Sequence, residues 1–202
     1  MTGATALEVR PLFDRYHYLG GNFADPIAVF ADRAPGGLFG DTGEPIAAAV
    51  YASPANRYFG NGAVELVRLV RCPNYPRQLS QFVAWSLRWL RRNTAWRFCI
   101  SYADTGAGHH GGIYQALGFV FVGESKGHAY WEHPATGGRC SARSFDQRRP
   151  ALRAGWQRRA GTKKYLYVQP LKEQRRDLLR RFGWTALPYP KPSSHTKKET
   201  TT

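Results

Sequence analysis

Short apolar runs separated by turns rich in glycine and proline dominate the first half of the chain. Residues 26–31 and 46–52 have the length and composition of strands, and the turn sequence between them predicts a β-hairpin. Residues 63–71 alternate between apolar and polar positions, which predicts a third strand. Pro73 ends this strand because a proline cannot donate to a sheet ladder.

Helical spacing of apolar side chains follows Pro76, a residue that suits the first turn of a helix. The apolar positions recur at intervals of three and four residues, which predicts a stripe that faces a core. The stripe consists of Leu79, Phe82, Val83, Ser86, Leu87 and Leu90. Trp85 and Trp89 widen this apolar face, which favours packing over base stacking as their role.

A polar turn flanked by two strands is the most informative stretch of the chain. Residues 99–102 predict a buried strand, and residues 103–112 hold four glycines, one aspartate and two adjacent histidines. Residues 113–117 predict a short helix that Gly118 stops in a left-handed conformation, and a further strand follows. In open α/β sheets ligands bind beyond the carboxyl ends of strands, so this turn is the expected site.

The aromatic residues near the N-terminus are a second candidate lining of that site. Residues 7–20 begin with a strand-like pattern and then bring Tyr16, His17 and Tyr18 just before a glycine pair. Consecutive aromatic and imidazole groups beside glycines can line a pocket. A purely structural histidine is the alternative interpretation of His17.

The last third of the chain has a different character from the rest. Two further strands are predicted at residues 128–133 and 165–171, and a short basic helix is predicted at residues 175–181. Three parts follow from these patterns. They are a core at 1–138, a basic part at 139–187 that completes the sheet, and a tail at 188–202 whose Pro, Ser, Thr and Lys content predicts disorder.

Positive charge is concentrated in that last third. Residues 1–138 carry 12 Lys and Arg against 10 Asp and Glu, whereas residues 139–202 carry 17 against 4. Such asymmetry is typical of proteins that bind nucleic acid or another anionic surface. A solvated tail without a target is the alternative, but aromatic and strand-like segments within the basic part argue against it.

The composition indicates the cellular compartment of the protein and excludes some classes of protein. No apolar run approaches the ~18 residues that a membrane span needs, and the N-terminus has no apolar signal region, so we expect a cytoplasmic protein without a membrane partner. The three cysteines, Cys72, Cys99 and Cys140, lack CxxC spacing, which argues against a disulfide framework or a zinc knuckle. The oligomeric state stays open, with a homodimer among the options.

The order of elements over residues 63–122 resembles the core of the GNAT acyltransferase fold. The run IYQALGF at 113–119 matches the helix-to-strand ending of many members. The resemblance implies an α/β (α+β) domain with a mixed, mostly antiparallel sheet flanked by helices and a basic C-terminal extension. Members usually hold the pyrophosphate of coenzyme A on a glycine-containing turn before the long helix. Residues 72–80, CPNYPRQLS, lack glycine and carry two prolines, which argues against acetyl-CoA as the cofactor.

Several longer runs resemble the phage Mom family. They are YHYLG at 16–20, ELVRLV at 65–70, SYAD at 101–104, GHHGGIYQALGF at 108–119, KKYLYV at 163–168 and YPKP at 189–192. The resemblance implies modification of the adenine exocyclic amine in duplex DNA to a methylcarbamoyl (acetamido) form. In phages this protects DNA from host restriction enzymes, so the host cytoplasm is the implied compartment. The alternatives are a GNAT acyltransferase acting on a protein or RNA amine, and a non-catalytic DNA-binding protein.

Adenine chemistry requires groups that stack on an extruded base, bind its edge and move a proton. The matching runs supply tyrosines that can stack on the base or hydrogen-bond to it. Asp104 can act as a base or can cap the turn. Arg68 can bind a carboxylate or carbonyl oxygen of the donor, or it can form an ion pair with Glu65. Ser101 can orient the donor, and the histidines can carry protons near neutral pH. The catalytic candidates are His17, Tyr18, Arg68, Ser101, Tyr102, Asp104, His109, His110 and Tyr114.

The residues do not identify the donor molecule, or whether a metal takes part. The product implied by the resemblance joins nitrogen to the CH2 carbon of an acetamide unit, which acetyl-CoA cannot give by simple acyl transfer. Another donor or a cofactor such as iron or another divalent metal is therefore considered. His17, Asp104 and His109 would form the two-histidine, one-carboxylate set of open iron sites.

The basic part is the expected surface for double-stranded DNA. Lysine and arginine bind phosphates without reading sequence. The candidate DNA-binding residues are Arg143, Arg148, Arg149, Arg153, Arg158, Arg159, Lys163 and Lys164.

Overall fold

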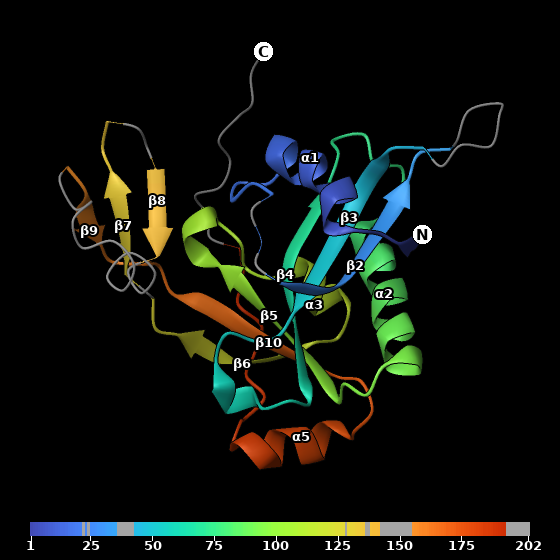
Figure 1. Ribbon diagram of the computed structural model, residues 1–202. Coiled ribbons are helices and arrows are strands. Elements are labelled where there is room, and N and C mark those ends of the chain that lie inside the picture. Colours follow the sequence, from blue (N-terminus) through green and yellow to red (C-terminus); the bar gives the residue numbers. More distant parts are fainter. Residues whose placement is uncertain are drawn as a thin grey trace.

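A computed structural model of the chain describes residues 1–21, 23, 25–35, 43–127, 129–135, 138–141 and 155–192. Within this described part, no helix is both long enough and apolar enough to cross a bilayer. Two sheets make up the β structure, a large one in the core and a small one beside it (Figure 1).

The large sheet has seven strands in the order β1-β2-β3-β4-β5-β10-β6. Every neighbouring pair is antiparallel except β4 with β5. The strands are β1 Thr2–Gly3, β2 Pro26–Arg33, β3 Pro45–Ala52, β4 Ala63–Arg71, β5 Phe98–Asp104, β10 Lys164–Pro170 and β6 Val120–Ser125. The mixed, mostly antiparallel sheet expected from the sequence is confirmed, and so is the hairpin of β2 and β3.

The parallel pair β4 and β5 is short, and its two strands part at one end. Pairing runs only from Ala63 with Phe98 to Leu66 with Ser101. The Ser101 hydroxyl donates to the Leu66 carbonyl at 2.9 Å and so joins the last paired residues. Beside this point the pairing of β3 with β4 shifts register and leaves Val67 without an opposite residue, as in a β-bulge. The strands therefore diverge beyond Leu66 and leave a split in the sheet.

The strand-like interpretation of residues 7–20 is wrong, because α1 occupies Ala6–Tyr16. Thr5 caps this helix: its hydroxyl accepts from the Glu8 amide, and the Glu8 carboxylate accepts from the Thr5 amide at 2.6 Å. Val9, Leu12 and Phe13 are buried at helical spacing. This face packs on one side of the sheet.

Helices cover both faces of the large sheet (Figure 1). Helix α1 packs with Ala48 and Val50 of β3, while α2, Leu79–Asn93, packs with Ala47 and Ala49 of the same strand. Because alternate strand residues point to opposite faces, these helices lie on opposite sides. The short α3, Gly112–Ala116, shares the α2 face, and α5, Arg175–Phe182, shares the α1 face.

The buried stripe of α2 is confirmed, since its Phe82, Val83, Ser86, Leu87 and Leu90 side chains are buried. The hydroxyl of Ser86 has a hydrogen-bond partner inside the core, because it lies 2.6 Å from the Tyr51 hydroxyl. Gly118 has φ +71°, so the left-handed stop after α3 is also confirmed.

The small sheet projects from the core between β6 and β10 of the chain (Figure 1). Its strands are β7 Tyr130–His133, β8 Gly138–Ser141 and β9 Gln157–Arg159, with β7 in the middle. We call it the wing. The chain then returns as β10, which lies between β5 and β6 in the large sheet.

Part of the segment predicted to be disordered has a defined place. The Tyr189 hydroxyl donates to the Phe119 carbonyl at 2.7 Å, and the Pro190 carbonyl accepts from Gln115 at 3.1 Å. Tyr189 and Pro190 thus have partners in α3 and at the start of β6 that composition does not reveal, and disorder of the tail at 188–202 stays a prediction. Residues 193–202 lie outside the described residues.

Candidate functional site

Five candidate residues from four segments meet at the split between β4 and β5. His17 and Tyr18 follow α1, Arg68 lies on β4, Asp104 ends β5, and His109 lies in the turn before α3. The His17 and Tyr18 rings stack at 4.8 Å between centroids, and the Tyr18 ring lies 5.7 Å from that of His109. We call these five residues the split cluster. It borders the α1 face of the sheet.

Arg68 is the cation of the split cluster, and it lacks a carboxylate partner. Its Nη1 donates to the Val67 carbonyl at 2.8 Å, while its Nε is buried without a hydrogen-bond partner in the described structure. No ion pair to Arg68 is found among the described residues, so the pairing with Glu65 considered from the sequence is not formed. Burial lowers the pKa of the guanidinium, yet an arginine stays charged. A half-buried cation of this kind is available to an anion or a developing negative charge.

His17 is neutral in this environment. Its Nδ1 accepts from the Leu19 amide at 3.1 Å, which leaves the proton on Nε2. Burial, followed by the nearby Arg68 and His109, lowers its pKa to about 4. The imidazole therefore keeps its tautomer and its orientation against Tyr18 at neutral pH.

Asp104 caps the turn that follows β5. Its Oδ1 accepts from the Gly106 amide at 3.0 Å and from the Thr162 hydroxyl at 2.8 Å, and its Oδ2 lies 3.8 Å from Lys164 Nζ. The turn also binds the chain that returns from the wing, because Thr105 donates to the Lys163 carbonyl at 2.7 Å. The capping role is thus present, and it ties the split cluster to the base of the wing.

Glu65, Lys164 and Thr162 are neighbours of the cluster that sequence reasoning did not assign to it. Burial raises the pKa of Glu65 to about 7, although Lys164 and Arg68 oppose the shift. Burial and Glu65 together raise the pKa of Tyr102 to about 12. Glu65 is therefore a proton acceptor poised near neutral pH. In the sequence, the only local indication of a role for Glu65 was that it is a single acid among the apolar residues of β4.

Two other candidates lie on the opposite face of the sheet. Ser101 is fully buried, and its hydroxyl is used by the Leu66 carbonyl and by Tyr114. Burial raises the pKa of Tyr114 to about 12, and its ring packs 5.3 Å from Tyr167. These hydroxyls join β4, β5 and α3 rather than line the open α1 side.

The two adjacent histidines diverge. His109 is exposed and faces Tyr18, whereas the His110 ring lies over Gly112. The His110 carbonyl accepts from the Tyr167 hydroxyl at 2.6 Å. Only His109 therefore belongs to the split cluster by its side chain.

Gly111 allows the turn to approach Tyr167. It has φ +84°, and a Cβ there would overlap the Tyr167 ring, whereas Gly118, with φ +71°, has no atom within 4 Å of such a Cβ. We expect Gly111→Ala to destabilise the fold by more than about 3 kcal/mol and Gly118→Ala by about 1 kcal/mol, because only the first adds overlap to backbone strain. Urea unfolding of both variants measures the difference. Equal losses would show that Tyr167 moves aside freely.

A cavity of about 410 Å³ opens on the α2 and α3 face. It is lined by Arg71, Arg77, Gln78, Leu79, Ser80, Gly112, Ile113 and Ala116. Asp32 orients Arg77 at 3.2 Å. The first-turn amides of α2 and two guanidinium groups suit a phosphate or carboxylate. Pro73 and Pro76 precede that first turn, so they do not remove its amides. The proline part of the sequence argument against a coenzyme A type of donor therefore does not hold, whereas the absence of glycine from residues 72–80 stands.

The metal set considered from the sequence is not assembled. No three His, Cys, Asp or Glu side chains in the described structure are placed to hold a metal ion. His17 Nδ1 and Asp104 Oδ1 already accept hydrogen bonds from the protein. The group of His17, Asp104 and His109 therefore does not fit a metal.

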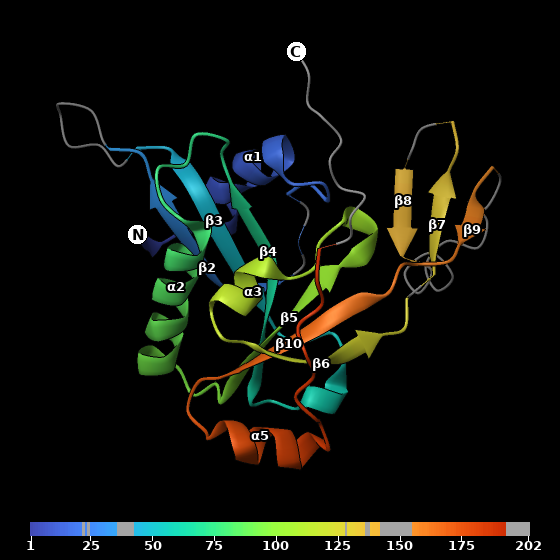
Figure 2. The ribbon, with the colours of Figure 1, turned by 180° about the vertical axis from the view of Figure 1, so that it is seen from behind.

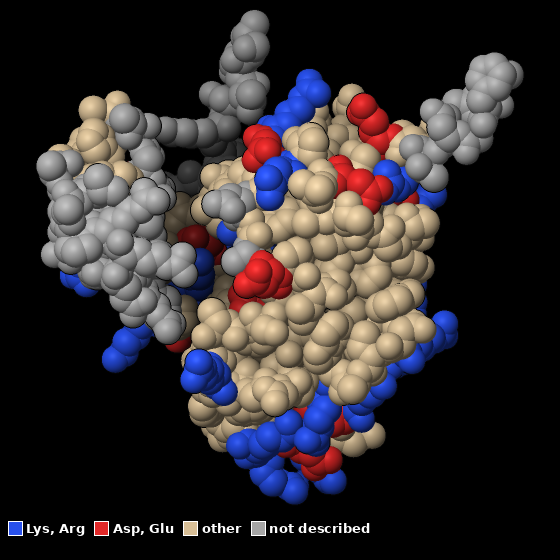
Figure 3. Space-filling view, in the orientation of Figure 1, with Lys and Arg blue, Asp and Glu red and all other residues tan. Residues whose placement is uncertain are grey.

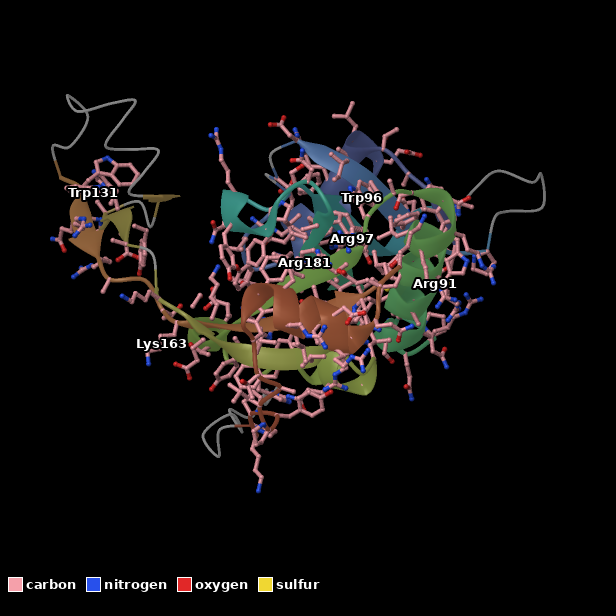
Figure 4. The ribbon with its side chains drawn as sticks, turned by 90° about the horizontal axis from the view of Figure 1, so that it is seen from below. Arg91, Trp96, Arg97, Trp131, Lys163 and Arg181 are labelled. Atoms are coloured by element: carbon pink, nitrogen blue, oxygen red, sulfur yellow. The ribbon has the colours of Figure 1, made fainter. Side chains whose placement is uncertain are left out.

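Four of the candidate DNA-binding residues, Arg143, Arg148, Arg149 and Arg153, lie outside the described residues. Of the others, Lys163 pairs with Glu124 at 2.9 Å and Arg159 pairs with Glu132 at 3.3 Å. Arg158 is exposed on β9, opposite Trp131 in the wing. Figure 4 shows Trp131 and Lys163 on the wing side of the molecule.

A second basic surface lies at the end formed by α2 and α5. In Figure 3 lysine and arginine gather at the bottom, over α5, while the centre of the view carries little charge. We call it the basic end. Its exposed cations are Arg88, Arg91, Arg92, Arg97, Lys172, Arg175, Arg176, Arg180 and Arg181. Arg97 and Arg181 both pair with Glu173, and Figure 4 shows Arg91 pointing away from the core.

Two of the solved structures that align with this chain are acetyltransferases. The ribosomal-protein-S18-alanine N-acetyltransferase of Escherichia coli aligns with a TM-score of 0.53 and 10% identity, over 86% of this chain and 94% of its own. A GNAT family acetyltransferase from Elizabethkingia anophelis, solved with acetyl-CoA bound, aligns with a TM-score of 0.41 and 14% identity, over 71% and 76%. The first of these likenesses confirms the GNAT-like fold.

The sequence itself is matched by one family. No curated protein matches the chain. The sequence model of the Mom protein family matches residues 12–191, a range that includes the whole split cluster and the strands that carry it. The chain therefore belongs to the Mom protein family.

Proposed function

We propose that this chain is a transferase that converts adenine in duplex DNA to the N6-methylcarbamoyl (acetamido) form. The observation that carries the proposal is the split cluster. It presents an exposed tyrosine ring, a guanidinium that forms no ion pair with the described residues, and a nearby carboxyl with a pKa of about 7, all where β4 and β5 diverge. Membership of the Mom family supports the same assignment.

An adenine must leave the duplex stack before its amine can react, at a cost of a few kcal/mol. Tyr18 is 55% exposed and stacks on His17, and His109 lies beside it. This ring pair offers a surface on which an extruded base can stack. Neutral His17 supports the surface without adding charge.

The transfer forms one bond and breaks another. The N6 lone pair attacks the CH2 carbon of an acetamide unit, and the bond from that carbon to its leaving group breaks, so that the leaving group departs with the electron pair. The N6 proton passes to the Glu65 carboxylate, directly or through one water. Arg68 stabilises the negative charge that develops on the departing atom of the leaving group.

The donor is defined here only by its chemistry. It carries the acetamide CH2 carbon on a leaving group, and the cavity with Arg71 and Arg77 suggests an anionic portion such as a phosphate. Gly112 at the start of α3 lines the same cavity, which brings the donor side close to the turn that carries His109.

DNA would approach from the wing side. The chain that links the wing to β10 contacts Asp104 through Thr162, so phosphates bound along the wing lie next to the cluster. We expect Arg158→Glu to reduce adenine modification at least tenfold at physiological salt. The matched control, Arg91→Glu on the basic end, should reduce it less than threefold, because each contributes about one phosphate contact but only the wing adjoins the site.

This comparison is measured on plasmid DNA modified by each purified variant at several salt concentrations. A larger loss for Arg91→Glu would contradict the approach from the wing. If both variants lost the same amount of modification, and only at high salt, positive charge would attract DNA generally and the wing would not be its specific binding surface.

The proposed activity is tested by expressing the chain in cells with a plasmid and analysing digested nucleosides by mass spectrometry. We expect a deoxyadenosine derivative heavier by one acetamide unit, and protection of the plasmid from restriction enzymes that cut at adenine-containing sites. An unmodified pool from soluble protein, with DNA binding retained, would instead favour a non-catalytic DNA-binding role.

A second candidate is acyl transfer to a protein or RNA amine. The cavity at the start of α2 is equally compatible with it, because that cavity suits an anionic donor whatever the acceptor is. Acetyl-CoA titration followed by calorimetry discriminates the two. Tight binding with acetylated protein or RNA and unmodified DNA would support the second candidate.

A further inference from the structure

The chain after α5 crosses the molecule to the turn that carries His109. The Trp184 amide donates to Leu179 of α5 at 2.9 Å, and the Leu187 amide donates to Phe121 at the free edge of β6, also at 2.9 Å. The Tyr189 hydroxyl donates to the Phe119 carbonyl at 2.7 Å. Figure 2 shows this segment rising from α5 past β6. We call residues 184–190 the strap.

Gln115 of α3 joins the strap to the turn. Its Nε2 lies 3.1 Å from the Pro190 carbonyl, 3.0 Å from the His110 carbonyl and 3.1 Å from the Tyr167 hydroxyl. The Tyr167 hydroxyl itself donates to the His110 carbonyl at 2.6 Å. One side-chain amide thus contacts the strap, the central strand β10 and the backbone of the turn.

This network acts one residue away from the split cluster. It fixes the His110 carbonyl, and the adjacent His109 ring faces Tyr18 at 5.7 Å. At its other end the turn is held by the bonds of Thr105 to Lys163 and of Gly106 to Asp104, so the Gln115 network is the fixed point on the His110 side. Gly108 and Gly111 both have positive φ, and the described hydrogen bonds of the His109 backbone include one from its amide to the Asp104 carbonyl at 3.0 Å.

We propose that the strap, acting through Gln115, positions the His109 turn for the reaction. Gln115 is a positioning residue, since its own side chain points to backbone and to Tyr167 and not into the split. This inference rests on the proposed function for its effect on activity, and its structural part stands independently. Displacing a catalytic group by about 1 Å can lower a rate about 100-fold, so a small loosening of the turn is enough.

The Tyr189 hydroxyl contributes little to stability, which makes the positioning role testable. Tyr189 is 43% exposed, and losing its one part-buried hydrogen bond to the Phe119 carbonyl costs about 1 kcal/mol. Tyr58 offers a matched control. It is 56% exposed, and its hydroxyl donates to the Phe182 carbonyl at 3.1 Å, at the end of α5 far from the turn.

The experiment compares Tyr189→Phe, Gln115→Met and Tyr58→Phe in the full chain. Protein labelled at its histidines gives ring NMR signals for His109 and His110, and plasmid modification gives activity. We expect Tyr189→Phe and Gln115→Met to shift or broaden both ring signals and to lower modification about tenfold, with a melting temperature close to that of Tyr58→Phe. The control should leave the His109 and His110 signals and the activity unchanged.

The two readouts separate failure of this inference from failure of the proposed function. Unchanged His109 and His110 signals in both strap variants overturn the inference, whatever the activity. Shifted signals together with a wild-type protein that modifies no adenine leave the positioning network supported and overturn the proposed function. If Gln115→Met does not fold, Tyr189→Phe decides alone.

Discussion

Arg68→Met is expected to lower adenine modification by about 100- to 1000-fold. Arg68 is the half-buried cation of the split cluster, and its Nε has no partner in the described structure. Removing one preorganised donor that meets developing negative charge costs about that factor in other enzymes. Methionine keeps much of the volume of the arginine side chain and removes the charge. Modified deoxyadenosine from purified protein and plasmid, measured over time, gives the rate.

Stability provides the control for this variant. A half-buried cation that forms no ion pair with the described residues is costly, so Arg68→Met should unfold at the same or a higher urea concentration than the wild type. Arg57→Met, at an exposed position, should leave the rate unchanged. If Arg68→Met lost activity only in proportion to a loss of folded protein, the charge would have no role in the reaction.

Glu65→Gln should lower the rate at pH 8 by about 100-fold and remove the dependence of the rate on pH near 7. Burial raises the pKa of Glu65 to about 7, so in the wild type the fraction of carboxylate, and with it the rate, rises with pH through that value. Glutamine cannot accept the proton. Glu124 is an exposed acid that pairs with Lys163, so Glu124→Gln is the matched control, and its rate should still rise with pH near 7.

The same substitution should stabilise the fold at alkaline pH. The pKa of Glu65 is higher in the folded chain than the ordinary 4.5, so ionisation favours the unfolded state and stability is lost as pH rises through about 7. At pH 8 Glu65→Gln should therefore unfold with a free energy higher by 1 to about 3 kcal/mol. His17 works in the opposite sense, since its pKa of about 4 makes stability fall as pH drops below 6.5. Measurement at pH 8 avoids that window. A variant less stable than the wild type at pH 8 would contradict the raised pKa.

Elements with a strong apolar period could be predicted from the sequence. The stripe of α2 and the alternation of β4 reflect burial that local spacing encodes directly. Helix α1 was missed because only Val9, Leu12 and Phe13 are buried there, and the aromatic run after it suggested a strand. The capping box of Thr5 and Glu8 was the feature of the sequence that could have predicted the start of this helix.

The split cluster could be found where its residues lie in conspicuous runs. Tyr18, Asp104 and His109 stand beside glycines or turns, which mark sites in a sequence. Glu65 and Lys164 could not be assigned in this way. Lys164 reaches Asp104 only because β10 inserts between β5 and β6, a pairing over long sequence distance that no local pattern encodes. The raised pKa of Glu65 depends on the same enclosure.

The split cluster and the cavity lie on opposite faces of the sheet, near the diverging ends of β4 and β5. The cluster borders the α1 face, and the cavity with Arg71 and Arg77 opens on the α2 face. In the proposed reaction the base and the donor therefore enter from opposite sides, and neither needs to leave before the other binds. Such an arrangement gives a ternary complex and direct transfer from donor to base. An intermediate carried on the enzyme is then unnecessary, and the order in which the two substrates arrive is free.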